Sequence, residues 1–251
     1  MMPCRRKIAI RDTGEGITMA PSRRVLEAAA LLRLGSMAFL LFVLILSVFV
    51  APVVIPPESA LGQIVEDFLI SLMLVSGAIA VSDRRYAVIP LGIVAVVFTA
   101  VRWTGGFAQA EMTPTIRAAA LLFALAILAL VIAIKVFGKG AKVRDRLWGA
   151  IALYMLLGVI WAVAYEFVSL RMPGAYTGIE PGGKGQAYQW IWIYFSFSTL
   201  TTVGYGDITP VARIARSLSN MEALIGQLYP AIVLARLVSL PAEDTRDDEE
   251  S

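Results

Sequence analysis

The sequence contains no histidine and only one cysteine, Cys4, among its 251 residues. A disulfide within the chain and a His/Cys metal site are therefore both excluded. Charged residues are also scarce, at 16% of the chain, whereas hydrophobic residues reach 58%. Soluble domains carry about 25% charged residues, so this composition is typical of a membrane protein. Without histidine, and with few carboxylates that we expect to be exposed, the sequence shows no constellation of acid, base and nucleophile, and we expect neither enzymatic activity nor a bound cofactor.

Long apolar runs predict six membrane crossings, because a helix needs about 20 residues to span the hydrocarbon core. The first run is longer than the apolar part of a signal peptide, so we expect it to be retained. The third run is short and contains Pro90, which makes it the least typical. The predicted crossings are residues 36–57, 61–82, 86–101, 115–137, 147–170 and 210–240.

The distribution of Lys and Arg predicts the orientation, because cytoplasmic loops of membrane proteins are enriched in these residues. With a cytoplasmic N-terminus, sixteen of the 22 basic residues lie on the inner side. We therefore predict a multi-pass protein of the cell membrane with both termini in the cytoplasm. The net charge of +3 comes from bases in short loops between apolar runs, so we expect membrane lipid rather than nucleic acid as a partner.

A polar, glycine-rich run interrupts the apolar sequence at Thr201-Thr202-Val203-Gly204-Tyr205-Gly206-Asp207. In an ordinary strand, successive residues face opposite sides. Gly204 and Gly206 lack a Cβ and tolerate positive φ, which would let alternate residues take mirror-like conformations and turn consecutive carbonyls toward one axis. Such uncharged oxygens can replace the water around an alkali cation. A plain glycine turn between two helices is the alternative.

These seven residues, with the aromatic run from Trp190 to Leu200 before them, resemble the pore signature of the potassium channel family. The resemblance implies an all-α membrane protein with six transmembrane helices, a re-entrant pore helix at residues 187–200, a selectivity-filter loop and a homotetrameric pore. It implies that K⁺, the permeant ion, binds the backbone carbonyls of the filter. The filter residues are Thr202, Val203, Gly204, Tyr205 and Gly206, with the K⁺ ligands at Thr202, Val203, Gly204 and Tyr205.

The resemblance also divides the chain into four parts, although it covers residues 147–240 and matches the preceding crossings only in number. These parts are a cytoplasmic N-terminal segment (1–35), a peripheral four-helix membrane domain (36–138), a pore domain (139–240) and an acidic cytoplasmic tail (241–251). The tail is too short to be a soluble ligand-binding domain. Within the pore domain, residues 171–185 are rich in Gly and Pro and are expected to form an exposed turret.

Six residues are predicted to support the filter. Tyr194 and Phe195 stand where many relatives carry a Trp-Trp pair, and Phe195 cannot donate a hydrogen bond. Glu166 matches a glutamate that props the pore loop, and Glu222 is expected to hydrogen-bond the re-entrant helix because a carboxylate facing lipid is costly. The set is Thr201, Asp207, Tyr194, Phe195, Glu166 and Glu222. An aromatic collar is predicted from Trp190, Trp192, Tyr194, Phe195, Phe197 and Tyr205, with a membrane-interface belt as the alternative for the two tryptophans.

Gly226 and Pro230 predict a gating hinge in the last helix. Gly226 lies 20 residues after Gly206, at the position where the family often has a hinge glycine. Glycine lowers helix rigidity and proline removes a backbone hydrogen bond. A kink that serves only packing is the alternative.

The first four crossings lack the arginine repeat of a voltage sensor. The fourth carries only Arg117 and Lys135, near its two ends. In the second crossing, Glu66 and Asp67 are predicted to form a charged cluster with Arg102 or Arg117. We therefore predict passive, K⁺-selective conduction with weak or no voltage gating. The alternatives are a non-selective cation channel, an active K⁺ transporter and a non-conducting membrane adaptor with a vestigial filter.

Overall fold

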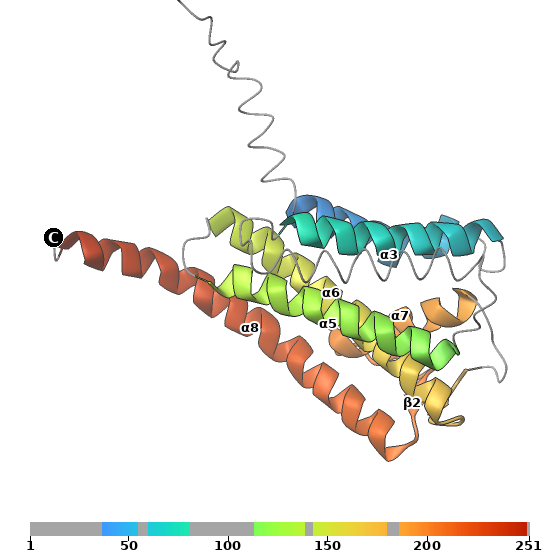
Figure 1. The fold of residues 1–251 in the computed structure, drawn as a ribbon. Coiled ribbons are helices and arrows are strands. Elements are labelled where there is room, and N and C mark those ends of the chain that lie inside the picture. The colour runs from blue at the N-terminus through green and yellow to red at the C-terminus, as the bar shows by residue number, and fades with distance from the viewer. Residues whose placement is uncertain (1–36, 55–59, 81–112, 139–142, 180–185, 250–251) are drawn as a thin grey trace, which may run out of the picture.

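The computed structural model describes residues 37–54, 60–80, 113–138, 143–179 and 186–249, which are mostly helical (Figure 1). The first helix, Met37–Val54, passes from α-helix into the π-helix η1 (Leu46–Val50) and then α2 (Ala51–Val54). The predicted segments 1–35 and 86–101 lie outside the described residues, as does Arg102. The remaining elements are α3 (Ala60–Ala80), α5 (Pro114–Phe137), α6 (Val143–Arg171), β1 (Tyr176–Thr177), α7 (Gln186–Leu200), β2 (Thr209–Pro210) and α8 (Arg213–Glu249).

Three helices in the described part of the chain are long and apolar enough to cross a membrane. They are Met37–Val54, Pro114–Phe137 and Arg146–Arg171, which correspond to the first, fourth and fifth predicted crossings. The second, α3, is apolar over the shorter stretch Asp67–Ile79. The prediction of a helical membrane protein is therefore confirmed, while the number of six crossings stays a prediction.

One hydrophobic core joins the peripheral helices to α6. It contains buried leucines from four helices: Leu40 and Leu44 from the first helix, Leu74 from α3, Leu125 and Leu128 from α5, and Leu156 from α6. The predicted boundary between residues 138 and 139 thus lies between two helices, α5 and α6, that pack against each other over this core. Near the start of α6, the buried Arg146 donates a hydrogen bond to the carbonyl of Gly138, the residue that follows α5, at 2.8 Å.

A second, aromatic core lies where α6, β1 and α7 meet. Tyr165 and Phe195 have ring centroids 4.8 Å apart, and Tyr176 and Trp192 have the same separation. All four side chains are buried. Aromatic pairs at these edge-on angles add to the apolar area that they bury. This core fixes α7 against α6, and the last residue of α7, Leu200, lies beside Gly226 of α8.

Two expectations about polar segments are wrong in part. The predicted turret is not exposed throughout, because Ala175 and Tyr176 are buried, Tyr176 in the aromatic core. The last helix does not end at Leu240 but continues to Glu249, and Figure 1 shows its end extending beyond the other helices. Helix propensity does not account for the continuation, because residues 241–249 include Pro241, Thr245 and three aspartates.

Gly226 of α8 allows a backbone contact that no other residue type permits. A Cβ at this position would lie 1.9 Å from the carbonyl oxygen of Leu200, the last residue of α7. Backbone cannot move aside as a side-chain tip can. Close packing of α7 on α8 therefore requires glycine at this position, which gives Gly226 a packing role whether or not it is a hinge.

Gly226→Ala should therefore destabilise the fold by about 1–3 kcal/mol, the usual cost of overpacking. Gly77→Ala is the matched control, because it also adds a methyl group inside a helix, but the new Cβ would meet the side chain of Leu128 rather than backbone, at 2.4 Å. Chemical unfolding in detergent, followed by circular dichroism, measures both. Equal losses of stability in the two variants would contradict the role given to Gly226.

Candidate pore loop

The chain leaves α7 through a defined C-terminal cap. The N–H of Val203 donates to the carbonyl of Ser198 and the N–H of Thr202 donates to that of Thr199, each at 2.9 Å. Thr202 has a φ of 60°, in the left-handed region. These two crossed hydrogen bonds around a left-handed residue form a Schellman motif, which normally has glycine in place of Thr202.

The other carbonyls in the last turn of α7 also accept hydrogen bonds. The N–H and the Oγ1 of Thr201 both donate to Phe197, at 3.1 and 2.6 Å. The hydroxyl of Tyr154, on α6, donates to Leu200 at 3.3 Å. The end of a helix leaves four carbonyls without a partner in the helix, and here each of them has one. The end of α7 and the start of the loop are therefore one hydrogen-bonded unit.

Positive φ recurs at every second residue of the loop. The values are 60° at Thr202, 56° at Gly204 and 81° at Gly206, whereas Val203 and Tyr205 have negative φ. This alternation is the one that the two glycines predict, and it departs from the two-sided pattern of a strand. Thr202 is the exception, because a β-branched residue rarely adopts positive φ and such strain is found mainly at functional sites.

The middle of the loop is uncovered in the single chain. Val203 is 54% exposed and Tyr205 is 71% exposed, and a Cβ built at Gly204 or Gly206 would meet no atom within 4 Å. The two glycines are therefore required by their backbone conformation rather than by crowding. Within the described residues of a single copy of the chain, no other segment covers the middle of the loop.

The C-terminal end of the loop is held by Asp207. The hydroxyl of Tyr194, on α7, donates to Oδ2 of Asp207 at 2.7 Å, and the N–H of Ile208 donates to Oδ1 at 3.0 Å. These two donors hold the pKa of the Asp207 carboxyl below its usual value, with the Tyr194 bond as the larger cause. The ring of Tyr205 stacks on that of Tyr194, with centroids 6.1 Å apart. Tyr194 thus links α7 to the end of the loop, although its neighbour Phe195 cannot donate a hydrogen bond.

Residues 175–178, which follow α6, also contact the C-terminal end of the loop. The two-residue strands β1 and β2 pair in antiparallel fashion, and the carbonyl of Ala175 accepts the N–H of Val211 at 2.8 Å. Gly178 has a φ of 86°, and a Cβ there would lie 1.8 Å from the carbonyl oxygen of Asp207. Part of the predicted turret is therefore hydrogen-bonded to, and packed against, the residues at the end of the loop.

A buried hydrogen-bond network joins α6, α7 and α8 behind the loop. Glu222 of α8 is fully buried, and its Oε2 accepts the hydroxyl of Tyr165, on α6. Its Oε1 lies 2.5 Å from Oγ of Ser196, on α7. The structure thus brings Glu222 into contact with α7, while its predicted effect on the filter stays a prediction.

The remaining predicted residues lie farther from the loop or have no assigned contact to it. Ring contacts join two pairs of the predicted aromatic collar: Trp192 with Phe195, inside the aromatic core, and Tyr194 with Tyr205, at the loop. Phe197 contacts Phe49 of the first helix. Glu166 is half-buried on α6, and its role stays a prediction. Pro230 is exposed on α8, which is helical on both sides of it, and the hinge also stays a prediction.

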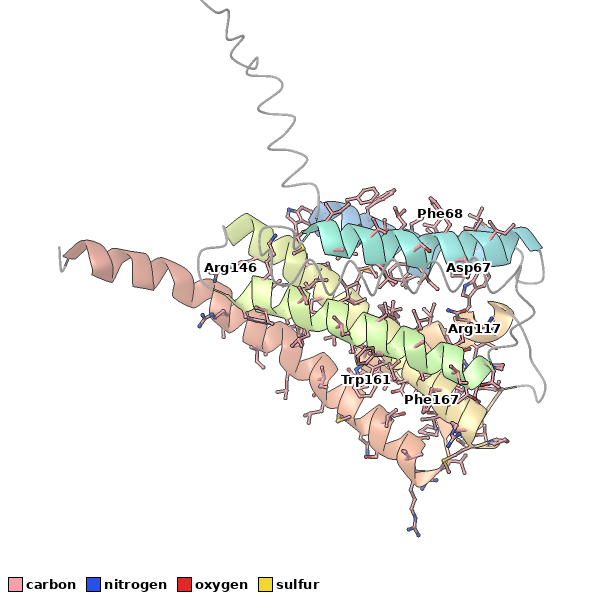
Figure 2. All side chains as sticks on the ribbon, viewed as in Figure 1. Asp67, Phe68, Arg117, Arg146, Trp161 and Phe167 are labelled. Carbon is pink, nitrogen blue, oxygen red and sulfur yellow. The ribbon has the colours of Figure 1, made fainter. Side chains whose placement is uncertain are left out.

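The predicted charged cluster is described only in part. Figure 2 shows Asp67 of α3 and Arg117 of α5 toward one end of the bundle, with Arg146 toward the other. Asp67 is half-buried and Arg117 is exposed. The side chain of Glu66 and all of Arg102 lie outside the described residues, so the cluster stays a prediction.

Comparison with known proteins supports the interpretation of the loop. Residues 181–243, which include the loop and most of α8, match the family described as an ion channel. Protein LctB of Geobacillus stearothermophilus is 35% identical over 98 residues, which cover 38% of this chain and 71% of that protein. Protein LctB of Bacillus caldotenax is 28% identical over 96 residues, with the same coverage. The inward rectifier potassium channel Kirbac3.1 of Paramagnetospirillum magnetotacticum is 31% identical over 80 residues, which cover 32% of this chain and 24% of the channel.

These matches, together with the apolar helices, define an ion channel domain of the potassium channel type in a membrane protein. The chain belongs to the same family as protein LctB. A channel domain also agrees with the expectation that the protein is not an enzyme.

The Tyr194 bond can be tested by titration. In Tyr194→Phe, the pKa of Asp207 should rise toward the usual aspartate value, because the ionised carboxylate loses its main donor. The bond stabilises the fold at pH values above the usual aspartate pKa, and its contribution is lost as the pH falls through the lowered pKa of Asp207. Nuclear magnetic resonance of a labelled Asp207 carboxyl measures the shift.

Tyr205→Phe is the control for this titration, because it removes a hydroxyl from the stacked ring and leaves the Tyr194 bond in place. An Asp207 pKa that moves in Tyr205→Phe and stays in Tyr194→Phe would contradict the assignment.

Proposed function

We propose that the protein is a potassium-selective channel that conducts K⁺ passively down its electrochemical gradient. The observation that carries this proposal is the alternation of φ at Thr202, Gly204 and Gly206 in an exposed loop at the end of α7. Alternating signs of φ turn consecutive carbonyls of the loop to one side, where they can replace the hydration shell of K⁺. In this proposal the ion binds the carbonyls of Thr202, Val203, Gly204 and Tyr205, and Gly206 completes the filter.

A single chain supplies carbonyls from one side only, so the proposal requires several copies, and we propose a homotetramer. Non-helical backbone at membrane depth is stable only inside protein or beside a water-filled cavity. The exposed middle of the loop meets this requirement when other copies surround it. The outward face of α8 also carries large apolar side chains that a neighbouring copy can cover, namely Ile214, Met221, Leu224, Leu228 and Ile232.

The relatives favour K⁺ over other ions. The relative from Paramagnetospirillum magnetotacticum is named as a potassium channel, and the ion channel match contains the whole loop. The negative end of the α7 dipole lies next to the start of the loop, where it favours a cation. We further propose a location in the cell membrane, with six crossings and both termini in the cytoplasm, on the evidence of the Lys and Arg distribution.

Ion flux tests the proposal directly. Purified protein in liposomes should take up Tl⁺, and the reversal potential should follow the K⁺ gradient rather than the Na⁺ gradient. Gly204→Ala should reduce flux at least tenfold, because a side chain at positive φ disfavours the conformation that the filter requires.

Gly174→Ala is the matched control. Gly174 also has positive φ, at 80°, and open space around its Cβ position, but it lies outside the loop. This variant should keep its flux even if its stability falls. Absence of Tl⁺ flux in the folded wild-type tetramer would favour a non-conducting adaptor, and a reversal potential that ignores the K⁺/Na⁺ ratio would favour a non-selective cation channel.

We also propose weak or no voltage gating. The helix α5 carries only Arg117 and Lys135, near its ends, along its 24 residues. Moving one charge through the membrane field is worth about 2.3 kcal/mol per 100 mV, so steep voltage dependence needs several such charges in each subunit. Conductance in planar bilayers should change gradually with voltage. A conductance curve as steep as that of a channel with an arginine repeat would refute this part of the proposal.

A further inference from the structure

Ser196 lies within hydrogen-bond distance of two oxygen atoms at once. Its Oγ is 2.7 Å from the carbonyl oxygen of Gly158, on α6, and 2.5 Å from Oε1 of Glu222, on α8. The serine hydroxyl has one proton, and a backbone carbonyl can only accept. The hydroxyl of Ser196 can therefore donate to one of these two oxygens but not to both.

Counting the protons around Glu222 and Ser196 identifies the missing donor. These two residues make three close oxygen–oxygen contacts, which are those of Ser196 with Gly158, of Ser196 with Glu222 and of Tyr165 with Glu222. The hydroxyls of Ser196 and Tyr165 supply two protons. We infer that Glu222 is a neutral carboxylic acid, which donates its own proton from Oε1 to Ser196 while Ser196 donates to Gly158 and Tyr165 donates to Oε2.

The surroundings of Glu222 favour a neutral acid over a carboxylate. Its side chain has no exposed surface. The ionisable groups that face it are the phenols of Tyr154 and Tyr165, from α6, and of Tyr176, from β1. Within the described part of the chain, the hydrogen-bond partners of its two oxygens are hydroxyls rather than Lys or Arg. A buried carboxylate without a cationic partner is far more costly than a hydrogen-bonded neutral acid.

The proton at Glu222 therefore completes a neutral chain of hydrogen bonds from α8 through α7 to α6. Its loss would place a negative charge in this core and leave one of the three contacts without a hydrogen. Ser196 lies one turn before the capped end of α7, so the proton fixes the helix from which the loop emerges. The inference concerns a buried proton-binding site and does not depend on whether the protein conducts ions.

Infrared spectroscopy of the purified full-length protein tests the inference, because a protonated carboxyl has a C=O stretch that a carboxylate lacks. The difference spectrum between wild type and Glu222→Gln should show the loss of one carboxylic acid band at neutral pH. The glutamine can keep the geometry, since its NH₂ donates to Ser196 and its C=O accepts from Tyr165. In Ser196→Ala the band should remain but shift in frequency, because the acid loses its acceptor.

Glu166→Gln is the matched control, because it removes another carboxyl from the same helical bundle and should leave the Glu222 band in place. If Glu222→Gln does not fold, the shift in Ser196→Ala decides the question. A wild-type spectrum without a band that responds to either Glu222→Gln or Ser196→Ala would show that Glu222 is ionised and would overturn the inference.

Discussion

The structure around the loop depends on which groups donate hydrogen bonds to the last backbone carbonyls of α7. A helix that ends inside a membrane protein cannot leave its last carbonyls to water, so other groups must donate to them. Here most of the donors are backbone N–H groups of the loop itself. The Schellman cap forces Thr202 into the left-handed region, and Gly204 and Gly206 continue the alternation that Thr202 begins. The hydrogen bonds that cap α7 therefore also set the backbone conformation of the loop.

The same helix end determines how α8 packs. The carbonyl of Leu200 receives the hydroxyl of Tyr154 from α6 and contacts the bare Cα of Gly226 from α8. Glu222 lies one turn before Gly226 on the same buried face of α8, and it reaches Ser196, one turn before the end of α7. A glycine contact and a carboxyl contact thus fix α8 along the last turn of α7. Any rotation of α8 would disturb both contacts, and with them the cap from which the loop starts.

The sequence was most informative where backbone chemistry decides the structure. Gly204 and Gly206 adopt the positive φ that the absence of a Cβ allows, and the apolar runs predict the helices α3, α5 and α6 to within a few residues. The left-handed Thr202 could not be predicted, because its own preference opposes that conformation and the cap overrides it. The contacts of Ser196, Tyr154 and Tyr165 depend on how three helices pack, and single hydroxyl residues give no signal in the sequence. The burial of Tyr176 was missed because the Gly and Pro residues around it indicate an exposed loop.

A single chain fixes the two ends of the loop by different means and leaves its middle open. The N-terminal end is held by the cap on α7, and the C-terminal end by Tyr194, Gly178 and the pairing of β1 with β2. Between them, Val203 and Tyr205 are mostly exposed, and the glycine positions have no near neighbours. A backbone with anchored ends and an unsupported centre can keep one conformation only if something else occupies the centre. In the proposed tetramer that support comes from the other copies and from the ion, so subunit assembly and K⁺ binding would stabilise the same five residues.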